Sequence, residues 1–178
     1  MKNFLQKQQG FTLVELLVGM SLTVLLLAVI FGLLFTSVRT WQTGSSRADI
    51  QQTARYAVDI IVRDLQYATK ITIGNPPASI DLWTSKYGTA QQITYKRVLV
   101  AGPAISRYVL TRDLHNGAGA QPVTGGGELA VSIAALTFTD LTPAGHSGIK
   151  TVGILLTAQD DDGRSYTLET AAAAMMIP

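Results

Sequence analysis

The sequence predicts an α+β protein in which one long N-terminal helix packs on an antiparallel β-sheet. Apolar residues recur three and four positions apart as far as Ala68, and after Gly74 they alternate with polar residues in several segments. The first part of the helix is a long run without charged side chains. We therefore expect four segments in the 178 residues: a leader (1–10), a membrane-spanning helix (11–38), an amphipathic helix (39–73) and a β-sheet head (74–178).

Residues 16–38 have the length and composition of a membrane-spanning helix. At about 1.5 Å per residue, this run covers about 35 Å, which is enough to cross a hydrocarbon core of about 30 Å. Glu15 directly precedes the run. Because a carboxylate at the bilayer centre costs about 2.5–3.5 kcal/mol, we expect Glu15 to have a compensating partner.

A row of small residues, Ala28, Gly32 and Thr36, lies within this span at intervals of four. Such a row lets a second helix approach closely. Small residues are also common in membrane helices for other reasons, so the row by itself favours neither interpretation.

The helical spacing of apolar residues continues beyond the membrane span, and no proline interrupts it before Pro76. We therefore expect the helix to extend to about Thr69. One face of this part is apolar and is expected to pack on the sheet, while Arg55, Asp59 and Arg63 mark the wet side. The apolar face consists of Ile50, Ala54, Ala57, Val58, Ile61, Leu65 and Ala68.

Tyr56, Ile60 and Tyr67 fall on a second arc of the same helix, well separated from the apolar face. Two aromatic rings and a branched aliphatic side chain have the composition of a protein interface. This arc either contacts neighbouring subunits or is buried by the flanks of the sheet or by the glycine-rich loop expected at 113–128.

Alternating polarity predicts strands near 79–84, 91–100, 104–112, 129–140, 150–158 and 164–172. The alternation changes phase at Ala134 and Ala135, which indicates a β-bulge. Asp162-Gly163 is typical of a tight hairpin turn, because glycine tolerates positive φ. The neighbouring Asp160 and Asp161 lack the spacing of a calcium loop, so we expect a solvated turn.

The composition offers little for catalysis. The chain has no cysteine, only two histidines, His115 and His146, both in expected loops, and no nucleophile-elbow motif. We therefore expect no enzyme, no cofactor and no metal site. Loss of the leader would remove Lys2 and Lys7 and leave 12 basic and 12 acidic residues, a balance that does not favour direct nucleic-acid binding.

The segment Gln9-Gly10-Phe11-Thr12-Leu13-Val14-Glu15-Leu16, with its short basic leader and the apolar run behind it, resembles the processing signal of type IV prepilins and pseudopilins. The resemblance implies cleavage after Gly10 by a prepilin peptidase and N-methylation of Phe11 by the same enzyme. It also implies that Glu15 pairs with the N-terminal amine of a neighbouring subunit during assembly. Neither an ordinary secretory signal peptide nor a generic membrane anchor explains Gly10 and Glu15 together.

Further stretches resemble J-type minor pseudopilins of type II secretion and W-type minor pilins. They are Ala54-Arg55-Tyr56-Ala57, Arg63-Asp64-Leu65-Gln66-Tyr67-Ala68, Leu136-Thr137-Phe138-Thr139-Asp140 and Asp162-Gly163-Arg164-Ser165-Tyr166-Thr167-Leu168. This likeness implies a minor subunit that helps start assembly near the filament tip. Glu15 argues against the K-type tip subunit, while Gly32 in place of a helix-breaking proline, and the missing cysteines, argue against a major pilin.

The implied partners are other minor and major pilins or pseudopilins, the peptidase, the inner-membrane assembly platform and membrane lipid. The implied location is the bacterial inner membrane, crossed once with the leader in the cytoplasm and the head outside, and the filament after assembly. A different interpretation is a single-pass, membrane-anchored binding module that does not polymerise.

Overall fold

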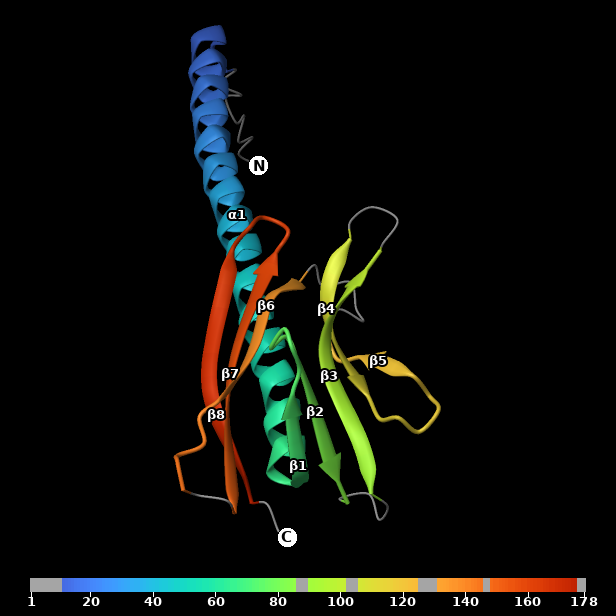
Figure 1. Ribbon diagram of the computed structural model, residues 1–178. Helices are drawn as coiled ribbons and strands as arrows, with labels where there is room; N and C mark the ends of the chain where they lie inside the picture. Colours follow the sequence, from blue (N-terminus) through green and yellow to red (C-terminus); the bar gives the residue numbers. More distant parts are fainter. Residues whose placement is uncertain (1–10, 86–89, 102–105, 125–130, 146–147, 176–178) are drawn as a thin grey trace, which may run out of the picture. The chain divides into compact units, whose positions relative to one another are not determined.

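The computed structural model describes residues 11–85, 90–101, 106–124, 131–145 and 148–175 (Figure 1). The chain divides into two compact units, Met1–Gly44 and Ser45–Pro178, and we call the second unit the head. Helix α1 (Leu13–Gln66) begins in the first unit and ends in the head. Each unit is described by itself below.

Every described residue of α1 up to Gln42 has an exposed side chain within the isolated chain. The helix is long and apolar enough to cross a membrane. Its polar side chains satisfy themselves locally: the hydroxyls of Ser21, Thr23 and Thr36 donate to backbone carbonyls three or four residues earlier, at 2.8, 2.8 and 2.9 Å. Such internal bonding suits a hydrocarbon solvent, which offers no hydrogen-bond partners of its own.

The described part of the head contains two antiparallel sheets (Figure 1). The larger has the order β1-β2-β3-β4-β5, with β1 (Ala68–Ile73), β2 (Ser79–Thr84), β3 (Gln91–Val100), β4 (Arg107–Asp113) and β5 (Ala120–Pro122). The smaller has the order β6-β7-β8, with β6 (Val131–Asp140), β7 (Ile149–Asp160) and β8 (Ser165–Met175). The α+β class is thus confirmed, with two sheets on the helix where the sequence predicted one.

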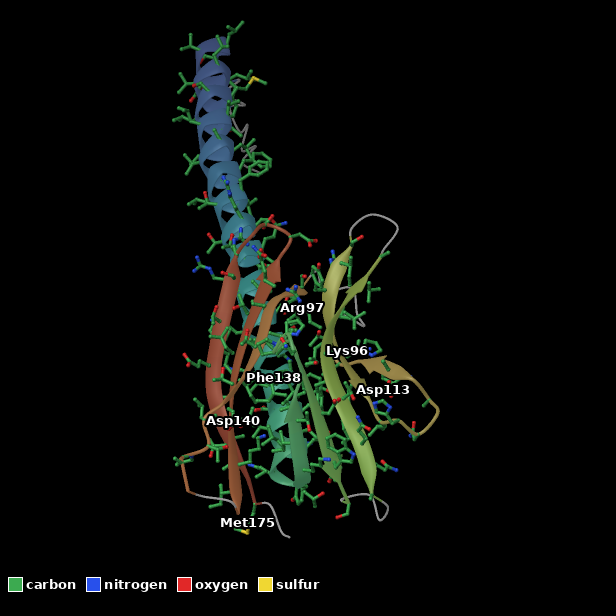
Figure 2. All side chains as sticks on the ribbon, viewed as in Figure 1. Lys96, Arg97, Asp113, Phe138, Asp140 and Met175 are labelled. Atoms are coloured by element: carbon green, nitrogen blue, oxygen red, sulfur yellow. The ribbon has the colours of Figure 1, made fainter. Side chains whose placement is uncertain are left out.

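The core lies between the apolar face of α1 and the inward side chains of both sheets. All members of the expected apolar face are buried, and none is more than 4% exposed. The strands supply the remaining large side chains, among them Phe138 of β6, which is 2% exposed (Figure 2). Burial of one such side chain stabilises a fold by about 1.5–3 kcal/mol, so this shared core holds the helix to the sheets.

A buried polar cluster joins α1 to the larger sheet. The carboxylate of Asp64, 4% exposed, accepts hydrogen bonds from the Tyr95 hydroxyl at 2.7 Å and from Arg112 Nε at 2.8 Å. Burial, and then the hydrogen bond to Asp64, raise the pKa of Tyr95 well above its usual range, so this hydroxyl remains a donor. The sequence pattern of the helix did not identify Asp64 as buried.

A second polar contact links the two sheets at a bulge in β6. The pairing register of β6 with β7 shifts between Ile133 and Ala135, as the change of phase in the sequence predicted. The guanidinium of Arg97, on β3, donates to the carbonyls of Ile133 and Ala134 (Figure 2). Because the bulge disrupts the ladder locally, these backbone carbonyls can accept hydrogen bonds from an arginine of the other sheet.

The helix ends earlier than the sequence predicted. We expected helix to about Thr69 within an amphipathic segment 39–73, but α1 ends at Gln66 and residues 68–73 form β1. β1 contains three β-branched residues in a row, Ile71, Thr72 and Ile73, and pairs with β2, which favours extended backbone. Tyr67 consequently lies in the turn after the helix, not on a helical arc with Tyr56.

The remaining strand predictions are close to the structure. Strands 79–84 and 91–100 match β2 and β3, and the turn at Asp162-Gly163 is confirmed by a φ of 80° at Gly163. The expected loop 113–128 contains the short strand β5, which pairs with β4, and residues 125–128 lie outside the described residues. The expected strand residues 104–105 and 129–130 also lie outside them.

Candidate functional site

The first described turn of the chain holds Glu15 in a capping arrangement. Thr12 precedes α1, and its hydroxyl oxygen accepts the backbone N–H of Glu15 at 3.2 Å. The Thr12 hydroxyl in turn lies 3.4 Å from Glu15 Oε2, to which it donates. This is close to a capping box, in which a threonine and the glutamate three residues later satisfy free donors at a helix start. The Thr-x-x-Glu spacing was readable in the sequence.

This position gives Glu15 two distinct properties. The positive end of the helix dipole favours a carboxylate in the first turn, so the isolated chain already stabilises this charge. The Thr12 contact is long and uses only one oxygen, which leaves the carboxylate able to bind a further cation. Phe11 beside it is 81% exposed, while Gly10 lies outside the described residues.

The row of Ala28, Gly32 and Thr36 is open along the first unit. All three residues are exposed, and a Cβ added to Gly32 would meet no atom within 4 Å. Packing within this part of the chain therefore does not require glycine at position 32. The row offers a smooth surface for a second helix.

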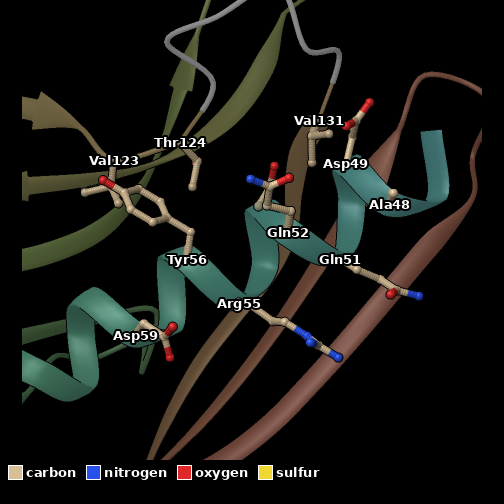
Figure 3. A pocket seen from close by; sticks show the side chains of 11 residues that line it. Ala48, Asp49, Gln51, Gln52, Arg55, Tyr56, Asp59, Val123, Thr124 and Val131 are labelled. Carbon is tan, nitrogen blue, oxygen red and sulfur yellow. The ribbon is translucent and has the colours of Figure 1, made fainter. Parts of the chain in front are cut away.

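A groove runs beside α1 in the head, where the helix faces the end of β5 and the start of β6 (Figure 3). Its volume is about 700 Å³. Tyr56 points from the helix toward Val123 and Thr124 and is 56% exposed. Most of its lining residues are of polar types, but apolar atoms form the larger part of the lining surface: Ala48, Asp49, Gln51, Gln52, Thr53, Arg55, Tyr56, Asp59, Val123, Thr124 and Val131.

The structure separates the three residues of the expected second arc. Tyr56 lines the groove, and Tyr67 is 57% exposed in the turn after α1. Ile60 is only partly exposed and packs against the hydrophobic core. Its substitution would therefore disturb the fold as well as any interface, which makes Tyr56 the cleaner probe of this surface.

Residues 5–34 match the family model described as the prokaryotic N-terminal methylation motif. This match supports a type IV prepilin-like family and indicates a pilin-like precursor, for which processing by prepilin peptidase and assembly with other pilins are implied. Together with the apolar helix it suggests anchoring in the inner membrane by one span. The motif is typical of structural subunits of the pilin type. No curated protein and no solved structure matches the chain.

The candidate catalytic and metal-binding residues do not form a site in the described structure. His115 Nε2 lies 2.9 Å from the hydroxyl of Thr94, and its backbone N–H donates to Asp113, while His146 lies outside the described residues. Among the described residues, no group of three histidine or acidic side chains is placed to hold a metal ion.

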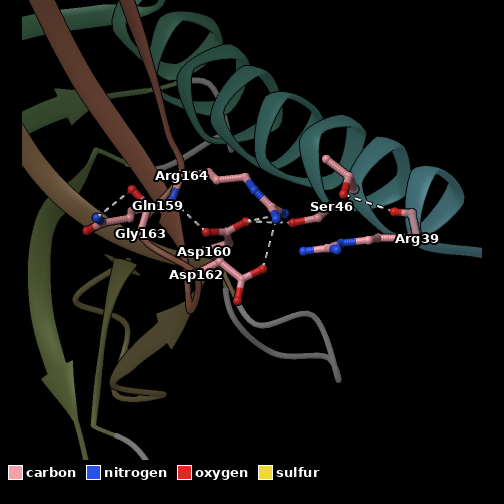
Figure 4. Close-up of polar contacts among 8 residues, drawn as sticks. Arg39, Ser46, Gln159, Asp160, Asp162, Gly163 and Arg164 are labelled. Atoms are coloured by element: carbon pink, nitrogen blue, oxygen red, sulfur yellow. Dashed lines mark hydrogen bonds and ion pairs between the residues drawn. The ribbon is translucent and has the colours of Figure 1, made fainter. Parts of the chain in front are cut away.

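The three aspartates of the β7–β8 turn each bind a polar or charged partner, and Asp160 and Asp162 share Arg164; we call this arrangement the clasp (Figure 4). Asp160 accepts a hydrogen bond from the Ser46 hydroxyl on α1 at 2.6 Å, and Asp161 pairs with Arg107 of β4 at 2.7 Å. Asp162 lies 3.2 Å from Arg164. The turn was expected to be solvated, but the side chain of Asp160 is only 8% exposed because the turn packs beside α1.

The clasp makes the stability of the head depend on pH. Burial alone would raise the pKa of Asp160, but the hydrogen bonds from Ser46 and from the backbone of Arg164, together with the Arg164 charge, hold it below its ordinary value. Because the pKa is lower in the folded state, the stabilisation is complete above the ordinary aspartate pKa of about 3.9. It is lost as the pH falls through the lower pKa of the folded state.

We expect Asp160→Asn to destabilise the head by roughly 1–2 kcal/mol near neutral pH, because a charged hydrogen-bond acceptor is lost. The difference from the natural protein should shrink as the pH falls below about 4. Unfolding of the full chain in detergent, followed by near-ultraviolet circular dichroism at several pH values, measures this. Asp162→Asn, at a side chain 68% exposed, serves as the control and should have a smaller effect. A difference that stays constant down to the lowest pH would contradict the assigned role of Asp160.

Proposed function

We propose that this protein is a minor pilin or pseudopilin, a structural subunit of a type II secretion pseudopilus or a type IV pilus. The observation that carries the proposal is the match of residues 5–34 to the methylation motif, a segment in which Gly10 and Phe11 precede an exposed apolar helix and Glu15 lies in its first turn. A long apolar helix joined to a β-sheet head is the architecture that such a subunit needs, since the helix can serve first as a membrane anchor and later as part of a filament core.

Several features support a minor subunit near the J-type and W-type groups that helps start assembly at the tip. The membrane span has Gly32 where major pilins usually have a proline, and the head has no cysteine for a disulfide. Glu15 distinguishes the chain from the K-type tip subunit. In this proposal the leader lies in the cytoplasm, the head lies outside, and the partners are other pilins or pseudopilins, the peptidase and the inner-membrane assembly platform.

The groove beside Tyr56 favours a second candidate function. A volume of about 700 Å³ lies in the range of small-ligand sites, so the head could act as a membrane-anchored binding module that does not polymerise. The open side of the groove, and its mixture of polar residues with apolar surface, favour a protein surface over a small apolar ligand. Processing distinguishes the two candidates, because a plain anchor would keep its leader.

The first prediction concerns cleavage of the leader. Coexpression with a prepilin peptidase should remove residues 1–10 and leave Phe11 as the methylated N-terminus. N-terminal sequencing and intact mass measure this, and a Gly10→Leu variant should remain uncut. An N-terminus at Met1 in the presence of active peptidase, or beyond residue 38, would refute the proposal.

The second prediction separates the charge of Glu15 from its role as a cap. Glu15→Gln keeps a side chain that suits a capping box but removes the charge. Thr12→Ala removes the cap but keeps the charge. If Glu15 neutralises the N-terminal amine of a neighbour, Glu15→Gln should be processed and inserted normally but should lose most of its incorporation into filaments, while Thr12→Ala should incorporate.

Incorporation is measured by the amount of each variant in sheared or crosslinked filaments, relative to its amount in the membrane. Equal loss in both variants would show that helix capping is the requirement. Normal incorporation of Glu15→Gln would show that electrostatic pairing is not the role of this residue.

The third prediction tests the groove as a subunit contact. Tyr56→Asp should leave thermal unfolding nearly unchanged, within about 0.5 kcal/mol, because the side chain is exposed. It should weaken copurification with partner minor subunits, since a buried aromatic anchor is often the strongest contact of an interface. Ala173→Asp, which adds the same charge on the exposed face of β8, is the matched control and should leave copurification unchanged.

A further inference from the structure

The adjoining ends of β3 and β4 form an exposed apolar surface on the head. We call Leu99, Val100 and Tyr108 the tip patch; they are 52%, 48% and 37% exposed. Leu99 pairs with Tyr108 across the two strands. Leu99 and Val100 are consecutive, so their side chains point to opposite faces of the sheet. A strand that packs on a core normally has one apolar face, whereas these strand ends expose apolar side chains on both faces, and grouped exposed apolar side chains are found at protein and membrane contacts.

The clasp places the tip patch at one end of the head. Arg107, the neighbour of Tyr108, pairs with Asp161 at 2.7 Å, and the adjoining Asp160 binds Ser46 at 2.6 Å. Figure 1 shows the ends of β3 and β4 at the same end of the head as the β7–β8 turn. Ser46 is near the first residue of the head, so the tip patch lies at the end where the chain enters from the apolar span.

The length of the connecting chain limits how far this end can be from the bilayer. The uncharged run ends at Val38, eight residues before Ser46. These residues cover about 12 Å as a helix and at most about 29 Å when fully extended. Trp41 in this connection is 78% exposed, and tryptophan is enriched at membrane interfaces. The connection therefore holds Ser46, at the clasp end of the head, within about 29 Å of the end of the span.

We propose that the tip patch inserts into the interfacial layer of the membrane that anchors residues 11–38, and so gives the head a second, reversible contact with lipid before the subunit enters a filament. The inference rests on the membrane anchoring in the proposed function. A lipid surface needs no shape complementarity, and this suits a small pair of strand ends. The sequence has no charged side chain between Arg97 and Arg107, and the charge of Arg107, which lies across from Val100, is paired with Asp161.

The polar neighbours of the tip patch suit the same interface. The Arg97 guanidinium lies 3.9 Å from the centre of the Tyr108 ring, a cation–π contact. Tyrosine at the level of the lipid headgroups, with a cation beside it, is a frequent arrangement at membrane surfaces. Tethering by the span raises the effective concentration of the patch at the bilayer, so a weak contact is sufficient and remains easy to release.

The absence of cysteine permits a direct test with single labels. Ser106→Cys places a fluorophore beside the tip patch without replacing any of its three residues. Leu141→Cys is the matched control: it is 51% exposed and lies at the other end of β7, where its backbone N–H donates to Thr151. Leu26→Cys reports insertion of the span itself.

The full chain is reconstituted in liposomes that carry a nitroxide quencher just below the headgroups. The fluorescence of the label at position 106 should fall at least about twofold, because the patch inserts to a shallow depth of about 5–10 Å. The label at position 141 should be unaffected, and a quencher near the bilayer centre should act on position 26. Leu99→Asp combined with Val100→Asp should reduce quenching at position 106 to the level at position 141, with unchanged circular dichroism.

Each failure has a distinct meaning. Quenching at 26 without quenching at 106 would overturn the tip-patch inference and leave the anchor intact. No quenching at 26 would overturn the anchoring on which the inference rests. Quenching at 106 that survives the double aspartate substitution, or that requires added partner subunits, would show that lipid contact by Leu99 and Val100 is not the cause.

Discussion

The structure depends on one helix whose side chains must satisfy two different environments. Up to residue 42, the side chains of α1 are exposed in the isolated chain and almost all apolar, and its hydroxyls bond to its own backbone. From Ile50 onward, one face of the same helix is buried against two sheets. In lipid, the polar groups of the first part must hydrogen-bond within the helix itself. In the head, the side chains of the second part must fit the shape of the sheets on which they pack. Glu15 stands out, because it is the one charged side chain of residues 11–38, and within its own chain it is supported by Thr12 and by the helix dipole.

The head is held together across its layers by polar contacts as well as by the core. Asp64 on α1 binds Tyr95 and Arg112 of the larger sheet, Arg97 reaches the carbonyls of the β6 bulge, and the clasp joins the β7–β8 turn to α1 and β4. Without cysteine, no disulfide fixes these layers. Each contact is charge-assisted, and such hydrogen bonds are stronger and more directional than neutral ones. They add directional links between the layers, which non-directional apolar burial does not supply.

The sequence predicted the features that depend on local patterns. The strands β2 and β3, the bulge at Ala135 and the turn at Gly163 all follow from alternation or from turn chemistry. The missed features depend on distant partners. Ala68 continues the helical spacing, but residues 68–73 form a strand that pairs with β2. Asp64 sits in a helix among charged residues, and its burial requires Tyr95 and Arg112, which lie 31 and 48 positions away. The division into two sheets likewise has no local signal. The processing segment, whose chemistry is confined to a few adjacent residues, was the easiest part to predict.

The surfaces left exposed differ in chemistry, and this difference bears on how a pilin-like subunit would use them. The row of Ala28, Gly32 and Thr36 is apolar and smooth, so a helix packed there would be held by close contact over a long seam. The groove at Tyr56 combines amide, carboxylate and guanidinium side chains with apolar surface, a mixture typical of reversible protein interfaces. In the proposed function, subunit choice through the groove can precede commitment through the helix, because a contact in the head can form and dissociate while the span is still in lipid. Recognition and permanent assembly would then be carried by different residues of the same helix.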